Sequence, residues 1–344
     1  MSKDYIFTDE DADLSILKER IIAIIGYGNQ GRAQALNMKE SGIEDLIVGN
    51  IEDQSWEQAK EDGFTIYSIP EAAEKADIIF YLIPDEVQPE VYESDIEPHL
   101  EEGDVLNFAS GYNITYDLIE PPEYVDVVMI APRMIGSMVR RLYKEGDGAP
   151  SFLAIDQDYS GNAKDTALAL GKGIGSTRSG VIEIDSFALE TKSDLLMEQG
   201  LFPLFMNTMM AKYELEVEEG MPPEAALLEL YLSKEVAYIF EEMAQQGIME
   251  QMPLHSQTSQ YGQLSRMDEI FEGESEEIDY EAIKEFMGRQ LRNIDNGKFA
   301  REWSTEQKMG YPSFNRIFEK YENSEMVREE QKAIEQLGLG EKED

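Results

Sequence analysis

The sequence predicts an α/β protein in which an N-terminal Rossmann-type doubly wound sheet precedes an all-helical C-terminal domain. In the first half, short apolar runs without alternation take turns with helical segments. Such runs are typical of strands that are buried on both faces of a parallel sheet. From about Ile184 onward, apolar residues recur at spacings of three and four, which is typical of helices. The expected strands are 21–25, 45–48, 78–83, 105–108, 125–130 and 151–155.

Two domains are expected from the length, because 344 residues exceed the usual size of one domain. Glycine and polar residues at 171–180 mark the approach to the boundary, and the stretch 225–243 is one example of the helical pattern beyond it. We predict a dinucleotide-binding domain at 1–183, a helical metal, substrate and dimerisation domain at 184–330, and a tail at 331–344, of which 341–344 should be frayed.

Acidic residues dominate the charge of the chain. The 71 Asp and Glu residues against 29 Lys and Arg give a formal charge of −42. This balance argues against a nucleic-acid partner, because phosphate contacts need a basic surface. Salt screens such self-repulsion, so we expect a halophilic protein from a salt-accumulating cytoplasm. The alternative is an ordinary acidic protein that its charge keeps soluble.

The composition also excludes several kinds of site. The chain has no cysteine, which excludes disulfides, thiolate metal sites and cysteine nucleophiles. With two histidines, chemistry must rest mostly on carboxylates, hydroxyls and amines. No apolar run approaches the roughly 20 residues that cross a bilayer, and the N-terminus lacks a secretory pattern. A cytoplasmic protein without a membrane partner is therefore expected.

A glycine-rich turn follows the first predicted strand and opens a helix. Its residues are Gly26, Tyr27, Gly28, Asn29, Gln30 and Gly31. Gly26 permits a tight turn, Gly28 lets the backbone approach a pyrophosphate, and Gly31 allows helix and strand to pack closely. The helix N-terminus then points at the phosphates. Alone, such a motif could be a mere turn, but its place between strand and helix predicts a nicotinamide dinucleotide site.

The loop after the second predicted strand, 49–56, meets the adenosine ribose in this kind of fold. It carries Glu52 and Asp53 but no arginine or lysine. A carboxylate accepts hydrogen bonds from a ribose 2′-hydroxyl and repels a 2′-phosphate, so NADH is expected to be preferred over NADPH. The alternative is that both acids belong to the solvated anionic surface.

Several segments along the chain, taken in order, resemble the ketol-acid reductoisomerase family. The resemblance covers nearly the whole chain, and the length fits the short form of the family. Ordered matches at several places are much more specific than one glycine motif. The matching segments are 9–14, 24–37, 84–88, 109–114, 172–175 and 299–303.

The resemblance implies an activity and an architecture. The protein would isomerise an acetohydroxy acid by a magnesium-dependent alkyl shift and then reduce the resulting keto acid with a nicotinamide, on the route to branched-chain amino acids. Its helical domain would be knotted and would pair with a second subunit, giving a homodimer or a higher homo-oligomer. Beside the turn at 27–30, the dinucleotide would lie against Ser55, Asp85, Gln88 and Gly136.

Four carboxylates from two helices hold the two magnesium ions of the family. The first pair is matched by Asp194 and Glu198, whose i to i+4 spacing places both groups on one helical face. By itself, such a pair is usually just a solvated face. Thr191 and Gln199 flank the pair as in the family, which favours a role in metal binding.

The second pair of carboxylates departs from the family. Counting forward from 223–224 leads to Glu229 and Ser233, whereas counting backward from 247–248 leads to Tyr231 and Glu235. One carboxylate is missing in either register, so the second ion should bind less tightly. Glu229 and Glu235 stand six positions apart and would not share a face of a regular helix. The candidate metal ligands are Asp194, Glu198, Glu229 and Glu235.

Other positions also depart from the family. Its active-site histidine corresponds to Ser110, and its catalytic lysine corresponds to Arg133, which keeps the charge but cannot readily give up a proton. The serine that contacts substrate from the partner subunit corresponds to Ser256, and His255 beside it is either a new acid or base or a structural residue. Bulky residues at 202–205 should reshape the pocket. The candidate catalytic residues are Arg133, Asp194, Glu198 and Ser256.

Three functions are compatible with these residues. The first is a working ketol-acid reductoisomerase with an altered metal site. The second is a reductase that has lost isomerisation and reduces another small keto or imino acid, since hydride transfer needs only one well-placed Lewis acid or cationic donor such as Arg133. The third is a dinucleotide-binding protein without catalysis.

Overall fold

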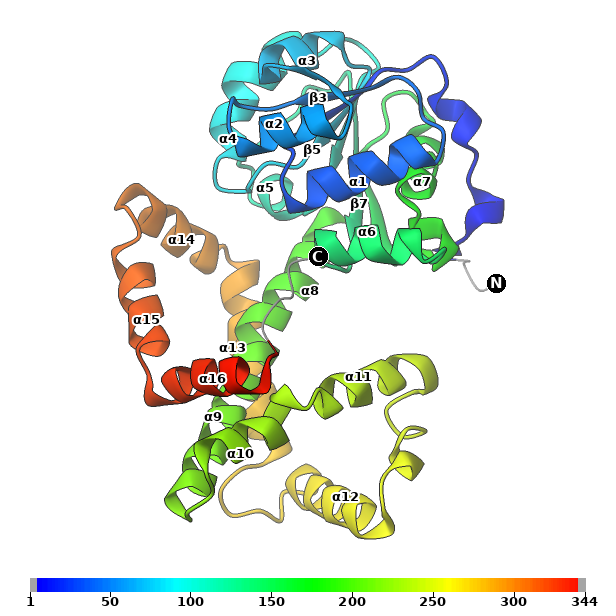
Figure 1. The fold of residues 1–344 in the computed structure, drawn as a ribbon. Helices are drawn as coiled ribbons and strands as arrows, with labels where there is room; N and C mark the ends of the chain where they lie inside the picture. Colours follow the sequence, from blue (N-terminus) through cyan, green and yellow to red (C-terminus); the bar gives the residue numbers. More distant parts are fainter. Residues whose placement is uncertain (1–4, 340–344) are drawn as a thin grey trace. The chain divides into compact units, whose positions relative to one another are not determined.

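The computed structural model describes residues 5–339, and contacts divide the chain into two compact units, Met1–Ser193 and Asp194–Asp344. We call them the sheet unit and the helical unit, and each is described by itself. All strands lie in the first unit, and the described part of the second contains helices and loops alone (Figure 1). The predicted α/β half followed by an all-helical half is therefore confirmed.

One nine-stranded sheet forms the centre of the sheet unit, in the order β1-β9-β8-β7-β6-β5-β2-β3-β4. Its members are β1 (Ile6–Phe7), β2 (Ile22–Ile25), β3 (Leu46–Gly49), β4 (Thr65–Tyr67), β5 (Ile78–Tyr81), β6 (Val105–Phe108), β7 (Asp126–Pro132), β8 (Ser151–Gln157) and β9 (Val181–Glu183). The strands from β7 to β4 run parallel, in the doubly wound order. All six predicted strands are present.

The edge beyond β7 differs from the prediction of a parallel sheet. β8 pairs antiparallel with β7, and β1 pairs antiparallel with β9, so the sheet is mixed. The apolar runs indicate only that a strand is buried on both faces. Because an antiparallel strand can be buried in the same way, these runs do not predict the direction of a strand. The short strands β1, β4 and β9 were not predicted, because two or three residues carry no periodic signal.

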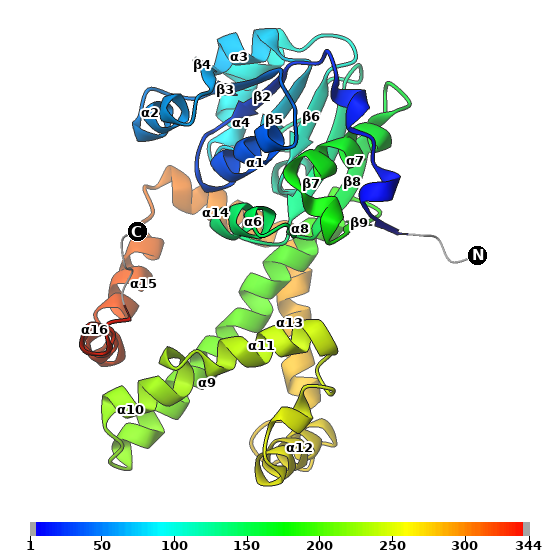
Figure 2. The same ribbon diagram turned by 45° about the vertical axis from the view of Figure 1, so that its right-hand side comes forward.

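Helices cover both faces of this sheet. They are α1 (Asn29–Glu40), α2 (Gln54–Glu61), α3 (Ile69–Lys75), α4 (Gln88–Val91), α5 (Tyr112–Thr115), α6 (Gly136–Lys144) and α7 (Ala163–Ile174). Met38 of α1 and Leu170 of α7 pack with Ile24 on one face, whereas Ala72 of α3 packs with Ile79 on the other (Figure 2). These two apolar layers explain why the central strands show no alternation.

The centre of the sheet contains the point where the strand order reverses. β2 and β5 are hydrogen-bonded neighbours there, although two strands separate them in the chain. In doubly wound sheets, ligands bind in the crevice outside the carboxyl ends of the strands at this point. β2 ends at Ile25, immediately before the glycine-rich turn. The topology therefore places the turn at the expected crevice.

The boundary between the units falls after Ser193, later than the predicted position between 183 and 184. The cause is α8 (Phe187–Leu196), whose first half packs into the sheet unit. Phe187 belongs to the apolar layer on the β5 side, and Glu190 is 2% exposed. The change of composition near Ile184 thus marks the start of a helix and not the end of the packed unit.

The helical unit continues from α8 through eight further α-helices in the described part of the chain. They are α9 (Phe202–Glu218), α10 (Pro223–Leu227), α11 (Glu235–Gln246), α12 (Gln257–Phe271), α13 (Tyr280–Asp295), α14 (Lys298–Lys308), α15 (Pro312–Glu322) and α16 (Glu325–Leu337). A small core joins α9, α10 and α16 through Tyr213, Leu227 and Ala333. Among residues 5–339, no helix combines the length and the apolar character that crossing a membrane requires.

Two π turns interrupt the helices that carry the candidate metal ligands. The first, η6 (Met197–Leu201), joins α8 to α9, and the second, η7 (Leu228–Leu232), follows α10. After η7, Lys234 has a left-handed backbone with φ of 66°, and α11 begins at the next residue. The helical stretch 225–243 is therefore broken in its middle. Its apolar spacing does not reveal this break, because a π turn keeps the backbone helical.

A buried carboxyl at the start of β6 makes the stability of the sheet unit depend on pH. Burial raises the pKa of Asp104 to about 6, and the nearby carboxylate of Asp77 adds to the rise. The folded-state pKa lies above the unfolded value of about 3.9, so this group stabilises the fold in acid and loses that contribution as the pH rises from about 4 to about 6.

We expect Asp104→Asn to raise the free energy of unfolding at pH 7 by about 1–2 kcal/mol, and to give no gain at pH 4. The amide oxygen can still accept the hydrogen bond that Asp104 receives from the Glu101 backbone N–H at 2.7 Å. Denaturant unfolding at the two pH values tests this, with Glu120→Gln, at an exposed acid that does not contribute to the pKa shift of Asp104, as control. An equal effect of both substitutions at pH 7 would contradict the prediction.

Candidate functional site

A cavity of about 820 Å³ opens at the carboxyl ends of β2, β3, β5 and β6. Among its lining residues are most of the positions predicted for the dinucleotide. These are Gly26, Tyr27, Gly28, Asn29, Gln30, Asp53, Ser55, Asp85 and Gln88. The glycine-rich motif therefore lines the crevice at which the sheet topology predicts ligand binding.

Close backbone approach explains the glycines of the turn. Gly26 has a φ of +96°, and a Cβ there would lie 2.9 Å from the backbone nitrogen of Ile83, which follows β5. A Cβ on Gly31 would lie 1.8 Å from the carbonyl oxygen of Gly26. Gly28 differs from both, because nothing lies within 4 Å of the position of its Cβ. Gly26 and Gly31 thus satisfy packing, whereas the space at Gly28 is open for a ligand.

A chain of hydrogen bonds connects the turn to the ribose loop after β3. The side-chain oxygen of Asn50 accepts a hydrogen bond from the backbone N–H of Tyr27 at 3.2 Å. Its amide donates to the carboxylate of Asp53 at 2.9 Å, and the same carboxylate caps α2 by accepting from Trp56 N–H at 3.1 Å. Asp53 is therefore fixed at the cavity wall, and Asn50 is a contributor that the motif did not reveal.

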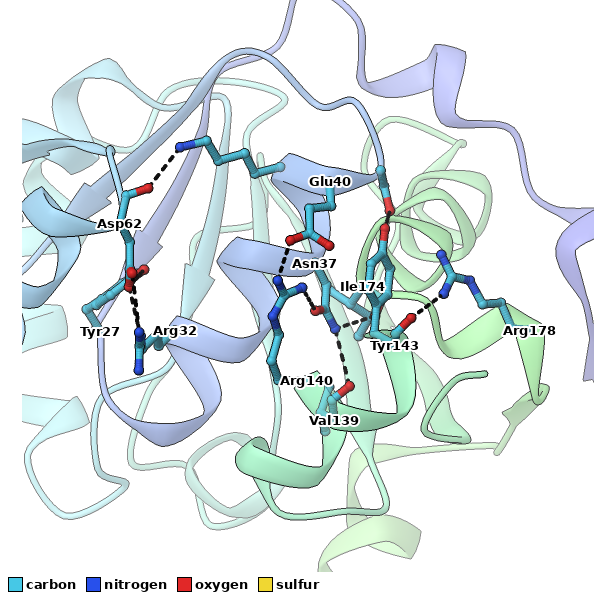
Figure 3. Close-up of polar contacts among 12 residues, drawn as sticks. Tyr27, Arg32, Asn37, Glu40, Asp62, Val139, Arg140, Tyr143, Ile174 and Arg178 are labelled. Atoms are coloured by element: carbon cyan, nitrogen blue, oxygen red, sulfur yellow. Dashed lines mark hydrogen bonds and ion pairs between the residues drawn. The ribbon is translucent and has the colours of Figure 1, made fainter. Parts of the chain in front are cut away.

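The side chain of Tyr27, one of the residues predicted to contact the dinucleotide, is buried and holds the local structure together. Tyr27 is 2% exposed, and its hydroxyl donates to the carboxylate of Asp62 at 2.9 Å (Figure 3). Burial, together with this hydrogen bond, holds the pKa of Tyr27 well above its ordinary value. The phenol thus remains protonated, and its hydroxyl is held at the C-terminal end of α2.

The loop after β5 is held by a buried amide. Gln88, which is 4% exposed, donates to the carbonyl of Ile83 at 2.9 Å and to the carboxylate of Asp85 at 3.2 Å. Its own carbonyl oxygen accepts from the Asn113 amide at 2.8 Å. Gln88 therefore fixes the loop after β5, and both Gln88 and Asp85 of this loop line the cavity.

The loop between β7 and α6 packs directly on the turn. Gln30 donates to the carbonyl of Met134 at 2.9 Å, and Gln34 in turn donates to the side-chain oxygen of Gln30 at 3.0 Å. A Cβ on Gly136 would lie 2.1 Å from the carbonyl oxygen of Asn29, so only glycine fits there. Gly136 packs on the turn but does not line the larger cavity, so the expected dinucleotide contact at this residue stays a prediction.

Arg133 lies at the end of β7 and pairs with a buried acid. Its guanidinium donates to Glu190 at 2.8 Å, and the other oxygen of Glu190 accepts from the backbone N–H of Gly111 at 2.8 Å. Gly111 directly follows Ser110, which lines the cavity. Glu190 therefore connects Arg133 to the loop that carries Ser110. Sequence reasoning missed Glu190, although it stands four residues before Asp194, on the same helical stripe.

The candidate residues of the helical unit occupy helix ends and π turns. Asp194 is half-buried on α8, while Glu198 is exposed within η6. Ser256 is the N-cap of α12, and its hydroxyl accepts from Ser259 N–H at 3.3 Å. His255 pairs with the side chain of Gln251 at 3.1 Å, which favours a structural role. Both residues thus have a local structural function at the start of α12.

The second pair of candidate ligands lies around the break in the helix. Glu229 is exposed within η7, and Glu235 is exposed at the first position of α11. The expectation that they cannot share a face assumed 100° per residue, and neither a π turn nor the left-handed Lys234 obeys it. Within residues 5–339, no three Asp, Glu or His side chains already converge on a metal-sized site.

Comparison with known proteins covers both units. A family model described as "Acetohydroxy acid isomeroreductase, NADPH-binding domain" matches residues 16–180, and "Ketol-acid reductoisomerase, C-terminal domain" matches 187–336. "Ketol-acid reductoisomerase (NADP(+))" from Methanopyrus kandleri is 43% identical over 336 residues, with 97% of this chain and 98% of that protein covered. The protein of the same description from Petrotoga mobilis is 43% identical, with 95% and 97% covered.

A solved structure shares the fold of nearly the whole chain. It is described as "NADH-preferring ketol-acid reductoisomerase from an uncultured archean" and superposes with a TM-score of 0.87 at 39% identity. The match covers 95% of this chain and 97% of that one. Both units therefore have a counterpart in one known protein.

The glycines of the turn offer a test that separates binding from folding. We expect Gly28→Ala to leave the free energy of unfolding unchanged within about 0.5 kcal/mol, because the methyl group enters open space. The same methyl group should lower dinucleotide affinity at least about tenfold, because it stands where a pyrophosphate approaches the backbone.

Gly262→Ala in α12, where a Cβ also meets nothing within 4 Å, is the matched control. It should leave dinucleotide affinity unchanged and, because it lies inside a helix, raise the free energy of unfolding by up to about 1 kcal/mol, whereas Gly31→Ala should destabilise the fold. Calorimetric titration with NADH and thermal unfolding give the two readouts. Tight binding by Gly28→Ala would refute the placement of the pyrophosphate.

Proposed function

The chain belongs to the ketol-acid reductoisomerase family, and we propose that it isomerises an acetohydroxy acid and reduces the product with a nicotinamide for branched-chain amino-acid synthesis. As a member of that family it is an NAD(P)-dependent oxidoreductase. The observation that carries the proposal is the match of both units, in order, to the two domains of one enzyme family. A small keto acid is the expected type of substrate.

We propose that NADH is preferred over NADPH. Asp53 lines the cavity with its carboxylate held by Asn50, so a 2′-phosphate placed there would meet a fixed negative charge. The structural relative is described as NADH-preferring, which supports this choice, whereas the Methanopyrus and Petrotoga relatives are described with NADP(+). Once bound, the nicotinamide would supply the hydride.

We propose that Mg²⁺ is held by Asp194, Glu198, Glu229 and Glu235. Carboxylate oxygens are the protein ligands that Mg²⁺ takes, and bound Mg²⁺ would act as a Lewis acid on the substrate oxygens. Glu198 and Glu229 both lie in π turns, which occur frequently at functional sites. The chemistry of these four carboxylates supports the choice of Mg²⁺.

Two registers are open for the second pair, and the local structure favours one glutamate from each. The forward and backward counts differ by two positions, and the helix is broken between the two acids by the second part of η7, which contains Glu229, and by the left-handed Lys234. Tyr231, the alternative from the backward count, donates its hydroxyl to Glu330 at 2.6 Å and so is engaged within the helical unit. We therefore assign Glu229 from one register and Glu235 from the other.

Arg133 and Ser256 complete the proposed catalytic set. The guanidinium of Arg133 would stabilise negative charge on a substrate oxygen without moving a proton, because arginine stays protonated. Glu190 fixes the orientation of Arg133 through their 2.8 Å ion pair. Because this arrangement suits reduction better than proton transfer, a reductase without isomerisation remains the second candidate, and Ser256 would serve as a substrate contact in both.

A second copy of the chain is proposed to cover the helical unit. Its helices expose large apolar side chains, among them Phe240 at 55%, Phe271 at 59% and Phe318 at 58%. Exposed apolar surface of this extent marks an interaction site. We propose a homodimer or higher homo-oligomer with the knotted helical path of the family, and a halophilic adaptation that lets its many carboxylates stay close at high salt.

The cofactor choice can be tested at Asp53. Asp53→Asn removes the charge but keeps a good helix N-cap, so folding should be little affected. We expect the ratio of kcat/KM for NADPH to that for NADH to rise by about tenfold. Glu52→Gln, which removes one charge from a residue outside the cavity lining, is the control and should leave the ratio unchanged. An equal rise for both would show that only surface charge matters.

The metal assignment can be tested with and without turnover. Mg²⁺ should raise the thermal midpoint of the wild type, and Mn²⁺ should bind in electron paramagnetic resonance titrations. Asp194→Asn should abolish activity, and both Asp194→Asn and Glu235→Gln should weaken ion binding by about tenfold or more. Glu241→Gln, an exposed acid on α11 beyond Glu235, should change nothing. Unaltered ion binding by Glu235→Gln would refute its assignment.

Two substrates distinguish the candidate reactions. Turnover of acetolactate with NADH and Mg²⁺ would establish isomerisation and reduction together. Turnover of 3-hydroxy-3-methyl-2-ketobutyrate alone, the already isomerised keto acid, would identify the reductase. Absence of both, despite measurable dinucleotide binding, would reject catalysis of this kind.

Assembly and salt dependence can be measured together. Light scattering in about 2 M KCl should give at least twice the mass of one chain, because a partner covers the apolar helices. Lowering KCl to about 0.1 M should reduce the thermal midpoint, because the Debye length grows from a few Å to about 10 Å and the carboxylates repel. A monomer at high salt, or a midpoint independent of salt, would reject the corresponding part of the proposal.

A further inference from the structure

His255 is held in the helical unit directly before Ser256, the N-cap of α12 (Figure 1). Its backbone N–H donates to the carbonyl of Met252 at 3.0 Å, and its own carbonyl accepts from the Gln260 amide at 2.7 Å. Its ring contacts the buried side chain of Gln251, while the histidine itself stays partly exposed. The residue is therefore fixed by three hydrogen bonds and is still accessible to a ligand.

The anchoring amide of Gln251 determines which ring nitrogen of His255 carries the proton. The amide nitrogen donates to the carbonyl of Ile248 at 3.2 Å and to the sulfur of Met252 at 3.3 Å. Its oxygen is therefore the end that faces Nε2 of the histidine, at 3.1 Å. An amide oxygen can only accept a hydrogen bond, so Nε2 must donate. A neutral imidazole has one N–H, which leaves Nδ1 as an acceptor.

Nδ1 of His255 is open to a ligand. Within residues 5–339, the structure shows no hydrogen bond or ion pair at this nitrogen. A base whose second nitrogen is held by another side chain is the arrangement that general-base catalysis uses. The chain has one other histidine, His99, in η4 (Glu97–His99) ahead of β6. His99 thus lies toward the amino end of that strand, away from the cavity at the carboxyl ends.

The proposed isomerisation needs a proton acceptor, which Arg133 and Ser110 do not supply. Arg133 stays protonated, and Ser110 carries a hydroxyl at the position where the family has a histidine. The acetohydroxy acid starts with a hydroxyl on the carbon that loses the alkyl group, and this hydroxyl ends as a carbonyl. Its proton must therefore be taken up, and a neutral nitrogen base beside the substrate can receive it.

We propose that His255 is the catalytic residue that takes this proton, at Nδ1. The inference rests on the proposed function, in which the next residue, Ser256, contacts the substrate. The O–H bond of the hydroxyl breaks, its proton moves to Nδ1, and its electron pair forms the new carbonyl. The alkyl group moves with its bonding pair to the neighbouring carbonyl carbon, whose oxygen becomes an alkoxide. This alkoxide takes the proton back from Nδ1, so protons and electrons balance and neutral His255 is restored.

Replacement by glutamine separates the base from the anchor. The new amide can still donate to Gln251, but it has no basic nitrogen, so His255→Gln should keep the thermal midpoint of the wild type. The variant should lower the ratio of kcat for acetolactate to kcat for 3-hydroxy-3-methyl-2-ketobutyrate by about a hundredfold, because the keto acid needs no proton abstraction. His99→Gln is the matched control and should leave this ratio unchanged.

The position of the ring proton can be measured without turnover. Long-range proton–nitrogen correlations in the NMR spectrum of the full chain should show two histidine rings, and His99→Gln assigns them. We expect the proton of neutral His255 on Nε2. A proton on Nδ1 overturns the proposal, as does an equal kcat ratio in His255→Gln and the wild type. A wild type that leaves acetolactate unconverted is distinguishable from both, because it rejects the proposed isomerisation together with this step.

Discussion

The site depends on close contacts between backbone segments, which leave no room for a side chain at three glycines. The turn after β2 approaches the end of β5 at Gly26, the following helix at Gly31 and the start of α6 at Gly136, and a Cβ at any of them would lie within 3 Å of backbone atoms. Because these contacts are between main chains, they fix the turn independently of any ligand. The open space at Gly28 is then a consequence of packing, and the cavity is preformed.

Much of the sheet unit could be predicted, because its signals are local. Each of the six predicted strands is an apolar run, and the glycine-rich turn stands directly between a strand and a helix. The direction of β8 could not be predicted, since burial on both faces looks alike in parallel and antiparallel strands. Contacts divide the units within α8, because the part of this helix before Asp194 packs with the sheet, whereas the predicted domain bounds follow the change of composition near Ile184.

The parts of the site that sequence reasoning missed come from distant segments. Asn50 connects the turn to Asp53, and Glu190 connects Arg133 to the loop of Ser110, yet no spacing rule relates these positions. The ribose loop itself has no cation, but Arg140 of α6 lines a second cavity together with Ser55 of that loop. A loop composition describes only the residues of that loop, whereas the electrostatic potential at a ligand includes all of its neighbours.

The π turn η7 has a consequence for how related chains are aligned. A π turn accommodates one extra residue without ending the helix, and the left-handed Lys234 allows the helix to restart in a new phase. Insertions can therefore accumulate between two side chains while the flanking helices keep their packing. In such a segment, equivalent positions are identified by working inward from both ends, and a gap placed inside a helix is then physically reasonable.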